Sequence, residues 1–147
     1  MKSTNPLYKF VEWSSPEELH EASLGWRSEL EFIKDEQQFL DSLIKNHTLQ
    51  LVSGELYAKS VAVISELLAE EKEVTSLLNR VYAHLNRLEV LTDGVDQLED
   101  EKSYKEEHYI LKIEVSRYSS DYRITKAKIF DLIKELMKKG KQKRIAK

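Results

Sequence analysis

The clearest regular pattern of apolar residues runs from residue 57 to residue 88, where seam positions recur at alternating spacings of three and four. These positions are Tyr57, Ser60, Ile64, Leu67, Glu71, Val74, Leu78, Val81, Leu85 and Leu88. Such alternation is the a/d pattern of helices that pack as coiled coils. The seam has apolar flanks on both sides, namely Leu56, Val63, Leu77 and Leu91 on one and Val61, Leu68 and Tyr82 on the other. An arc this wide predicts a helix that contacts more than one neighbour.

A second helix is predicted upstream, from residue 15 to about residue 46. Ser15 is a favourable N-cap, Pro16 suits the first helical position, and Glu18 completes a capping box. Apolar residues then recur every seven positions, at Leu19, Trp26, Ile33 and Leu40. The pattern ends at Asn46-His47-Thr48, and the next helix is expected to begin near Ser53-Gly54.

A third helix is predicted from about residue 95 to Gly140. Its seam again alternates by three and four, at Tyr104, His108, Leu111, Val115, Tyr118, Tyr122, Thr125, Ile129, Leu132 and Leu136. The short Thr92-Asp93-Gly94 turn before it makes this helix the antiparallel partner of the preceding one. The predicted fold is therefore all-α, an antiparallel bundle of three long helices with coiled-coil-like heptad seams over residues 15–139. Residues 1–14 are expected to pack on the bundle, and residues 140–147 to form a basic flexible tail.

Composition supports one helical domain. The 147 residues are 33% charged and 41% apolar, with only 4 Gly and 2 Pro, which is typical of long helices rather than sheets. The absence of Cys excludes disulfides and thiol chemistry. Because the N-terminus lacks the apolar core of a secretion signal, a cytoplasmic location is expected. No apolar run approaches the roughly 18 residues of a membrane span.

Charge is unevenly placed along the chain. The net charge is −3, and the last ten residues contain six basic residues and no acid: Lys138, Lys139, Lys141, Lys143, Arg144 and Lys147. This basic tail suggests an alternative function, the binding of nucleic acid or an anionic surface. However, basic residues also favour a helix C-terminus, and the acidic remainder of the chain repels a polyanion. Nucleic acid is therefore the secondary hypothesis.

A metal site is the first candidate chemistry. Glu17 and His20 have the Glu-x-x-His spacing of di-iron bundles, which require two such motifs. The other histidines lack a carboxylate at the matching offset, and Glu17 and His20 lie in the first turn of a capped helix. We therefore predict no metal and no other cofactor.

A basic line on the second long helix is the other candidate site. Arg80, His84 and Arg87 lie at i, i+4 and i+7, which suits contact with an anion or with the carboxylates of a partner. The alternative is a solvated face whose cations pair with acids on the first half of the third helix. Neither a nucleophile motif nor a glycine-rich loop is present, so no enzyme is expected.

The leading functional prediction is a non-enzymatic helical bundle that acts through protein–protein contacts, as a scaffold, adaptor or regulator. At about 1.5 Å per residue, the helices are about 45, 57 and 66 Å long, so the first cannot cover the other two. A homodimer would bury the uncovered flank, and we expect glutamates at Leu77 and Leu91 to break it. Alternatively, residues 1–14 cover the gap.

Overall fold

The protein consists of three long helices and two short ones. The computed structural model describes the backbone of residues 6–93 and 98–146, and the side chains of residues 6, 8–90 and 100–140. In chain order the elements are α1 (Pro6–Trp13), α2 (Pro16–Asn46), α3 (Thr48–Leu51), α4 (Tyr57–Asp93) and α5 (Leu98–Ala146). Within these residues there is no strand, so the predicted all-α class is confirmed.

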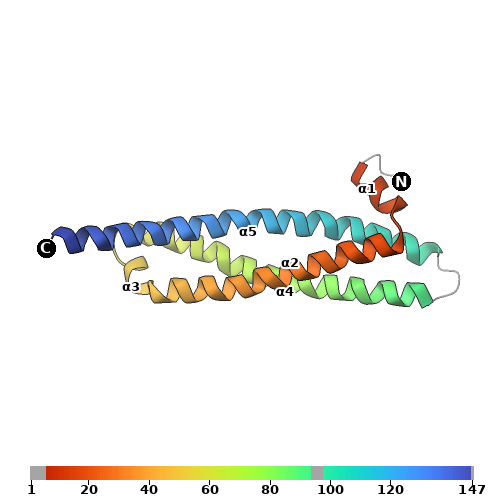
Figure 1. Cartoon of the computed structure of the whole chain (residues 1–147), viewed down its shortest axis with the longest axis horizontal. Helices are drawn as coiled ribbons and strands as arrows, with labels where there is room; N and C mark the ends of the chain where they lie inside the picture. The colour runs from red at the N-terminus through yellow and green to blue at the C-terminus, as the bar shows by residue number, and fades with distance from the viewer. Residues whose placement is uncertain (1–5, 94–97, 147) are drawn as a thin grey trace.

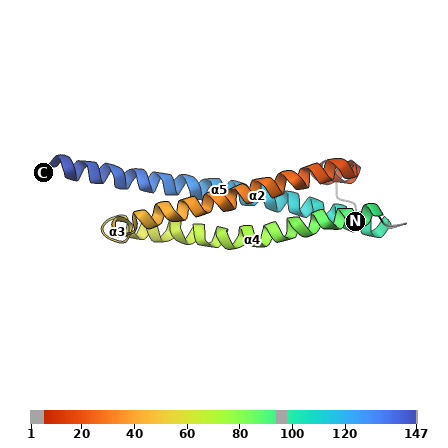
Figure 2. The same ribbon diagram turned by 60° about the horizontal axis from the view of Figure 1, so that its bottom comes forward.

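The long helices lie side by side along the long axis of the molecule. Helix α4 packs against α2 and against α5, while α2 and α5 contact each other less extensively. Along this axis α4 runs in the opposite direction to α2 and α5 (Figure 1). The turned view shows α4 along one side of both other helices (Figure 2).

The start of α2 is set by local hydrogen bonds. The Ser15 hydroxyl accepts from the backbone N–H of Glu18 at 3.2 Å, and the Glu18 carboxylate accepts from the backbone N–H of Ser15 at 3.1 Å. This is the predicted capping box, with Pro16 at the first helical position. The predicted end at Asn46 is also confirmed.

Two predicted boundaries are wrong, both at glycines. Helix α4 begins at Tyr57 rather than near Ser53-Gly54, because Gly54 has a φ of 84° and turns the chain between α3 and α4. Helix α5 continues through Gly140 to Ala146. One internal Gly costs a helix only about 1 kcal/mol relative to Ala, and the lysines around Gly140 are good helix formers.

Most predicted seam positions are buried. Every listed seam residue of α5 is buried, as are most of those on α4, whereas Tyr57 is 53% exposed. The flanks of the α4 seam differ. Leu56, Val63 and Leu77 are buried inside the chain, whereas Val61, Leu68 and Tyr82 remain exposed. The expectation that Leu77 belongs to the uncovered flank is therefore wrong, and the Leu91 side chain lies outside the described residues.

Helix α1 packs on α5. Val11 is buried in a small cluster with Leu19, Leu88 and Tyr104. The Tyr8 and Tyr109 rings meet edge to face at 5.3 Å, and the Lys105 ammonium donates to the Glu12 carbonyl at 2.7 Å. Residues 6–13 thus cover one end of the long helices (Figure 1).

None of the described helices has a stretch that is both long and apolar enough to cross a lipid bilayer.

Candidate functional site

A pair of buried histidines joins α4 to α5 near the end of the molecule that α1 covers. Nε2 of His84 lies 2.9 Å from Nδ1 of His108. The two residues are only 0% and 2% exposed. Burying a polar ring costs free energy unless its hydrogen bonds are made. The hydrogen bond between the two imidazoles therefore offsets part of the cost of placing them in the core.

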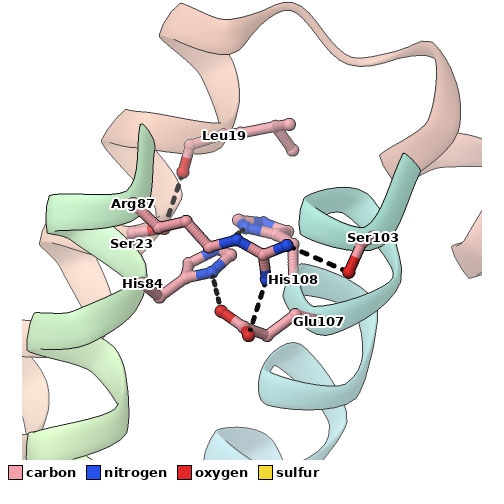
Figure 3. A network of polar contacts seen from close by, with 7 residues as sticks. All are labelled: Leu19, Ser23, His84, Arg87, Ser103, Glu107 and His108. Atoms are coloured by element: carbon pink, nitrogen blue, oxygen red, sulfur yellow. Dashed lines mark hydrogen bonds and ion pairs between the residues drawn. The ribbon is translucent and has the colours of Figure 1, made fainter. Parts of the chain in front are cut away.

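A carboxylate and a guanidinium complete the network on the solvent side. Nδ1 of His84 lies 2.6 Å from Oε1 of Glu107. Arg87 donates to Oε2 of Glu107 at 3.0 Å and to the Ser103 hydroxyl at 2.9 Å. Figure 3 shows how Glu107 connects Arg87 with the imidazole of His84. The contacts therefore run in series from Arg87 through Glu107 and His84 to His108.

This series fixes the positions of the imidazole protons. An ionised Glu107 can only accept, so Nδ1 of His84 carries its proton and Nε2 of His84 is an acceptor. His108 must then donate from Nδ1. In that tautomer Nε2 of His108 is left as an acceptor, and it makes no hydrogen bond to the described residues.

Aromatic rings enclose the pair and keep it neutral. Tyr104 stacks on His84 at 4.2 Å between centroids, and Trp26 lies 4.5 Å from His108. Burial lowers the pKa of His84, against the opposing effect of Glu107. Burial lowers the pKa of His108 to about 3, helped by repulsion from the protonated form of His84 and from Lys112. Both rings are therefore uncharged near neutral pH.

An open cleft of about 390 Å³ adjoins His108. Three helices form its walls: α1, α2 and α5. The lining residues are Phe10, Val11, Ser14, Glu18, Leu19, Glu21, Ala22, Trp26, His108 and Lys112. The Lys112 ammonium lies 4.6 Å from the centre of the Phe10 ring, a cation–π distance. The cleft is thus mostly apolar, with charges of both signs among its lining residues.

The three residues of the predicted basic line differ in exposure, since Arg80 is exposed and Arg87 is half-buried. His84 is buried, Arg80 forms an ion pair with Glu114, and Arg87 forms one with Glu107. Both carboxylates belong to α5, which agrees with the alternative interpretation of these cations. The sequence analysis missed the partnership of His84 with His108. The only available signal was the antiparallel hairpin predicted around Thr92-Asp93-Gly94, which brings the end of one helix beside the start of the next but does not by itself align His84 with His108.

A second polar group of residues lies near the middle of the bundle. The Gln37 amide donates to the Tyr118 hydroxyl at 2.9 Å, and that hydroxyl donates to the Glu70 carbonyl at 2.7 Å. Burial raises the pKa of Glu71 to about 7, helped by the adjacent carboxyl of Asp41. These contacts occupy polar atoms inside the core but form no open site.

The outer face of α4 differs from the rest of the surface in having almost no charge. We define it as the exposed α4 residues Ala58, Val61, Ala62, Ser65, Leu68, Ala69, Lys72, Thr75, Ser76, Asn79, Tyr82, Ala83, Asn86 and Val90. Lys72 is the one charged member of this set. Four other exposed residues of α4 are charged. Lys59, Glu66 and Arg80 form ion pairs with α5, and Glu89 lies next to the last residue of the outer face.

The other candidates from the sequence, a metal site and the basic tail, provide less evidence for a functional site. Among the described residues, no group of three or more His, Asp or Glu side chains is placed to hold a metal ion. In the basic tail, Lys138 is exposed and Lys139 forms an ion pair with Glu55 at 3.1 Å. The side chains of Lys141, Lys143, Arg144 and Lys147 lie outside the described residues.

Comparison of the chain with models of protein families, with curated proteins and with solved structures finds no match.

Proposed function

We propose that the chain is a non-enzymatic helical-bundle protein that acts through protein–protein contacts, and that its first partner is a second copy of itself. The observation that carries the proposal is the low number of charged residues on the outer face of α4. Charged residues make up 33% of the chain, yet this face holds a single lysine among its exposed residues. Depletion of charge is the compositional feature that most distinguishes the core of a protein interface from other surface.

The apolar residues of the outer face favour burial. Val61 and Leu68 are 46% and 51% exposed and lie seven residues apart, so they follow one line along the helix. Removing apolar surface from water contributes roughly 25 cal/mol per Å². A partner that covers this line would gain that contribution without having to desolvate a row of charges.

The small residues beside that line favour a helix as the partner. Ala62, Ala69, Ser76 and Ala83 repeat every seven residues next to Val61 and Leu68. Short side chains let two helices approach closely, and dispersion contacts increase as the gap narrows. The face spans residues 58 to 90, about 48 Å at 1.5 Å per residue.

A second copy satisfies these requirements with a closed geometry. In a two-fold dimer the same face meets itself, so both uncovered lines are buried at once and no further surface remains to extend the assembly. The proposal includes the finer fold prediction, an antiparallel bundle whose coiled-coil-like seams leave only this side of α4 to the partner.

Light scattering coupled to size exclusion tests the proposal, over protein concentrations that span about a hundredfold. The expected mass at high concentration is twice 17.2 kDa. Leu68→Glu should shift the protein to the monomer while circular dichroism stays helical. Ile113→Glu on α5 is the matched control, because Ile113 is 44% exposed and outside the proposed interface. A mass of 17.2 kDa throughout would overturn the dimer.

A further inference from the structure

The cleft beside His108 combines an imidazole acceptor with aromatic walls, a combination that the proposed dimer does not use. His108 is 2% exposed and lines the cleft together with Trp26, Phe10 and Leu19. A volume of about 390 Å³ falls in the range of small-molecule sites, which are typically apolar with a few polar groups that fix orientation.

The polar group is an acceptor that requires a donor. The series from Glu107 through His84 leaves Nε2 of His108 with a lone pair and no hydrogen bond to the described residues. A ligand that donates to this nitrogen would displace water from the open cleft, and the low polarity of the aromatic walls strengthens that hydrogen bond relative to one in bulk water.

Nearby charges determine which kind of donor is favoured. Lys112 also lines the cleft and disfavours positive charge at His108. The carboxylates of Glu18 and Glu21, which line the same cleft, disfavour an anion. The apolar residues Val11, Leu19 and Ala22 favour a ligand with a hydrophobic body. A neutral ring with one O–H or N–H fits all of these conditions.

We propose that the cleft between α1, α2 and α5 binds a small neutral aromatic molecule that donates a hydrogen bond to Nε2 of His108, such as a phenol or an indole. Phe10 and Trp26 supply the aromatic walls, and offset or edge-to-face packing on them orients the ring. Glu107 and His84 act as positioning residues, since they hold His108 in the tautomer that accepts.

Paired ligands test the role of the donor. We would titrate the full chain with p-cresol and with toluene, which differ by the hydroxyl, and follow binding by NMR of the ligand and by the ¹⁵N shifts of the histidine rings. We expect p-cresol to bind at least tenfold more tightly than toluene and to move the Nε2 resonance of His108. Equal binding of the two, or no binding of p-cresol at millimolar concentration, would overturn the proposal.

Two variants test the location. Ala22→Phe places a large side chain at a lining position on α2 while leaving both histidines unchanged, and it should abolish binding of p-cresol. His108→Phe retains an aromatic ring but removes the acceptor, so it should reduce the preference for p-cresol over toluene to about unity. Binding that survives Ala22→Phe unchanged would place the ligand elsewhere and contradict the assignment. Circular dichroism of both variants checks that the helices are retained, and Ala22→Ser is the matched control for a substitution at that position that leaves the cleft open.

Discussion

Helices α4 and α5 have similar inner faces and different outer faces. Each buries a seam of residues along its length, and the two meet at polar contacts such as that between His84 and His108. On α5, charged residues are spread over the exposed surface: Asp100, Glu101, Lys102, Glu106, Arg117, Asp121, Arg123, Lys128, Asp131, Lys134 and Lys138. On α4 the exposed charged residues are fewer, namely Lys59, Glu66, Lys72, Arg80 and Glu89, and only Lys72 belongs to the outer face as defined above. The proposed interface on α4 would account for this difference, since the cores of protein interfaces are depleted of charged residues.

Substitutions on the inner faces should have the largest effect on the free energy of unfolding, and the effect should be similar on α4 and α5. Leu67 on α4 and Leu111 on α5 are each 1% exposed. Leu67→Ala and Leu111→Ala should each lower the free energy of unfolding by about 2–5 kcal/mol, because each leaves a cavity in the core. Leu68→Ala on the outer face is the matched control. Measured by urea unfolding at a concentration where the chain is monomeric, it should change stability by less than about 1 kcal/mol.

The second largest effect should be a loss of folding stability in acid, through the histidine pair between the inner faces of α4 and α5. The pKa of His108 is lowered to about 3, whereas an unfolded histidine titrates near 6.5. The unfolded chain therefore binds the proton first, and stability falls as pH decreases below about 6.5. Between pH 7 and pH 5 the loss from His108 should be about 2 kcal/mol.

Urea unfolding at the two pH values measures that loss. The His108→Phe variant should lose most of the difference, since it removes the group whose pKa is lowered. Equal pH dependence in the variant and the natural chain would show that the pair does not control acid stability.

Glu71, on the inner face of α4, should have a smaller effect on the pH dependence of stability, and in the opposite direction to that of His108. Burial raises its pKa to about 7, with further raising by Asp41. The folded chain therefore holds a proton that the unfolded chain has already released, and stability falls as pH rises from about 4.5 through 7. Because Glu71 is partly exposed, Glu71→Gln should raise stability at pH 8 by only about 1 kcal/mol, and less at pH 5. Thermal unfolding at the two pH values measures the difference.

The exposed ion pairs at the edge between α4 and α5 should contribute least to the free energy of unfolding. Arg80 pairs with Glu114, and their side chains are 46% and 35% exposed. Arg80→Ala should cost no more than about 0.5 kcal/mol, because exposed ion pairs gain little net energy. Repeating the measurement at high salt checks the assignment, since the remaining effect should decrease further. A loss above about 2 kcal/mol would mean that this edge stabilises the fold as strongly as a core contact.

Local signals in the sequence were sufficient for the regular parts of the fold. The Ser15 capping box predicted the start of α2 correctly. All of the seam positions that the three-and-four spacing predicted on α5 are buried in the structure. Those features depend on neighbours in the chain. The position of Gly54 outside α4 and that of Gly140 inside α5 depend on backbone conformation, for which residue type alone is ambiguous.

The site required information that local patterns do not contain. His108 was placed in a seam and His84 on a basic line, yet their contact depends on how α4 and α5 are aligned. Likewise, the sequence identified two flanks on α4 but not which of them α2 and α5 cover. Leu77 and Val61 are equally apolar in the sequence, and only packing separates a residue that is 4% exposed from one that is 46% exposed.

The most direct test of the proposed interface is the rate at which a thiol on each outer face reacts. The chain has no cysteine, so Ala69→Cys on α4 and Ser120→Cys on α5 each introduce a single exposed thiol. Maleimide labelling would be followed at protein concentrations from about 1 to 100 μM, a range over which a dimer forms by mass action. If the outer face of α4 is the interface, the Ala69→Cys thiol becomes protected as concentration rises, while the Ser120→Cys thiol reacts at a constant rate. Constant rates at both positions, or protection of the Ser120→Cys thiol alone, would contradict the proposal that the outer face of α4 is the dimer interface.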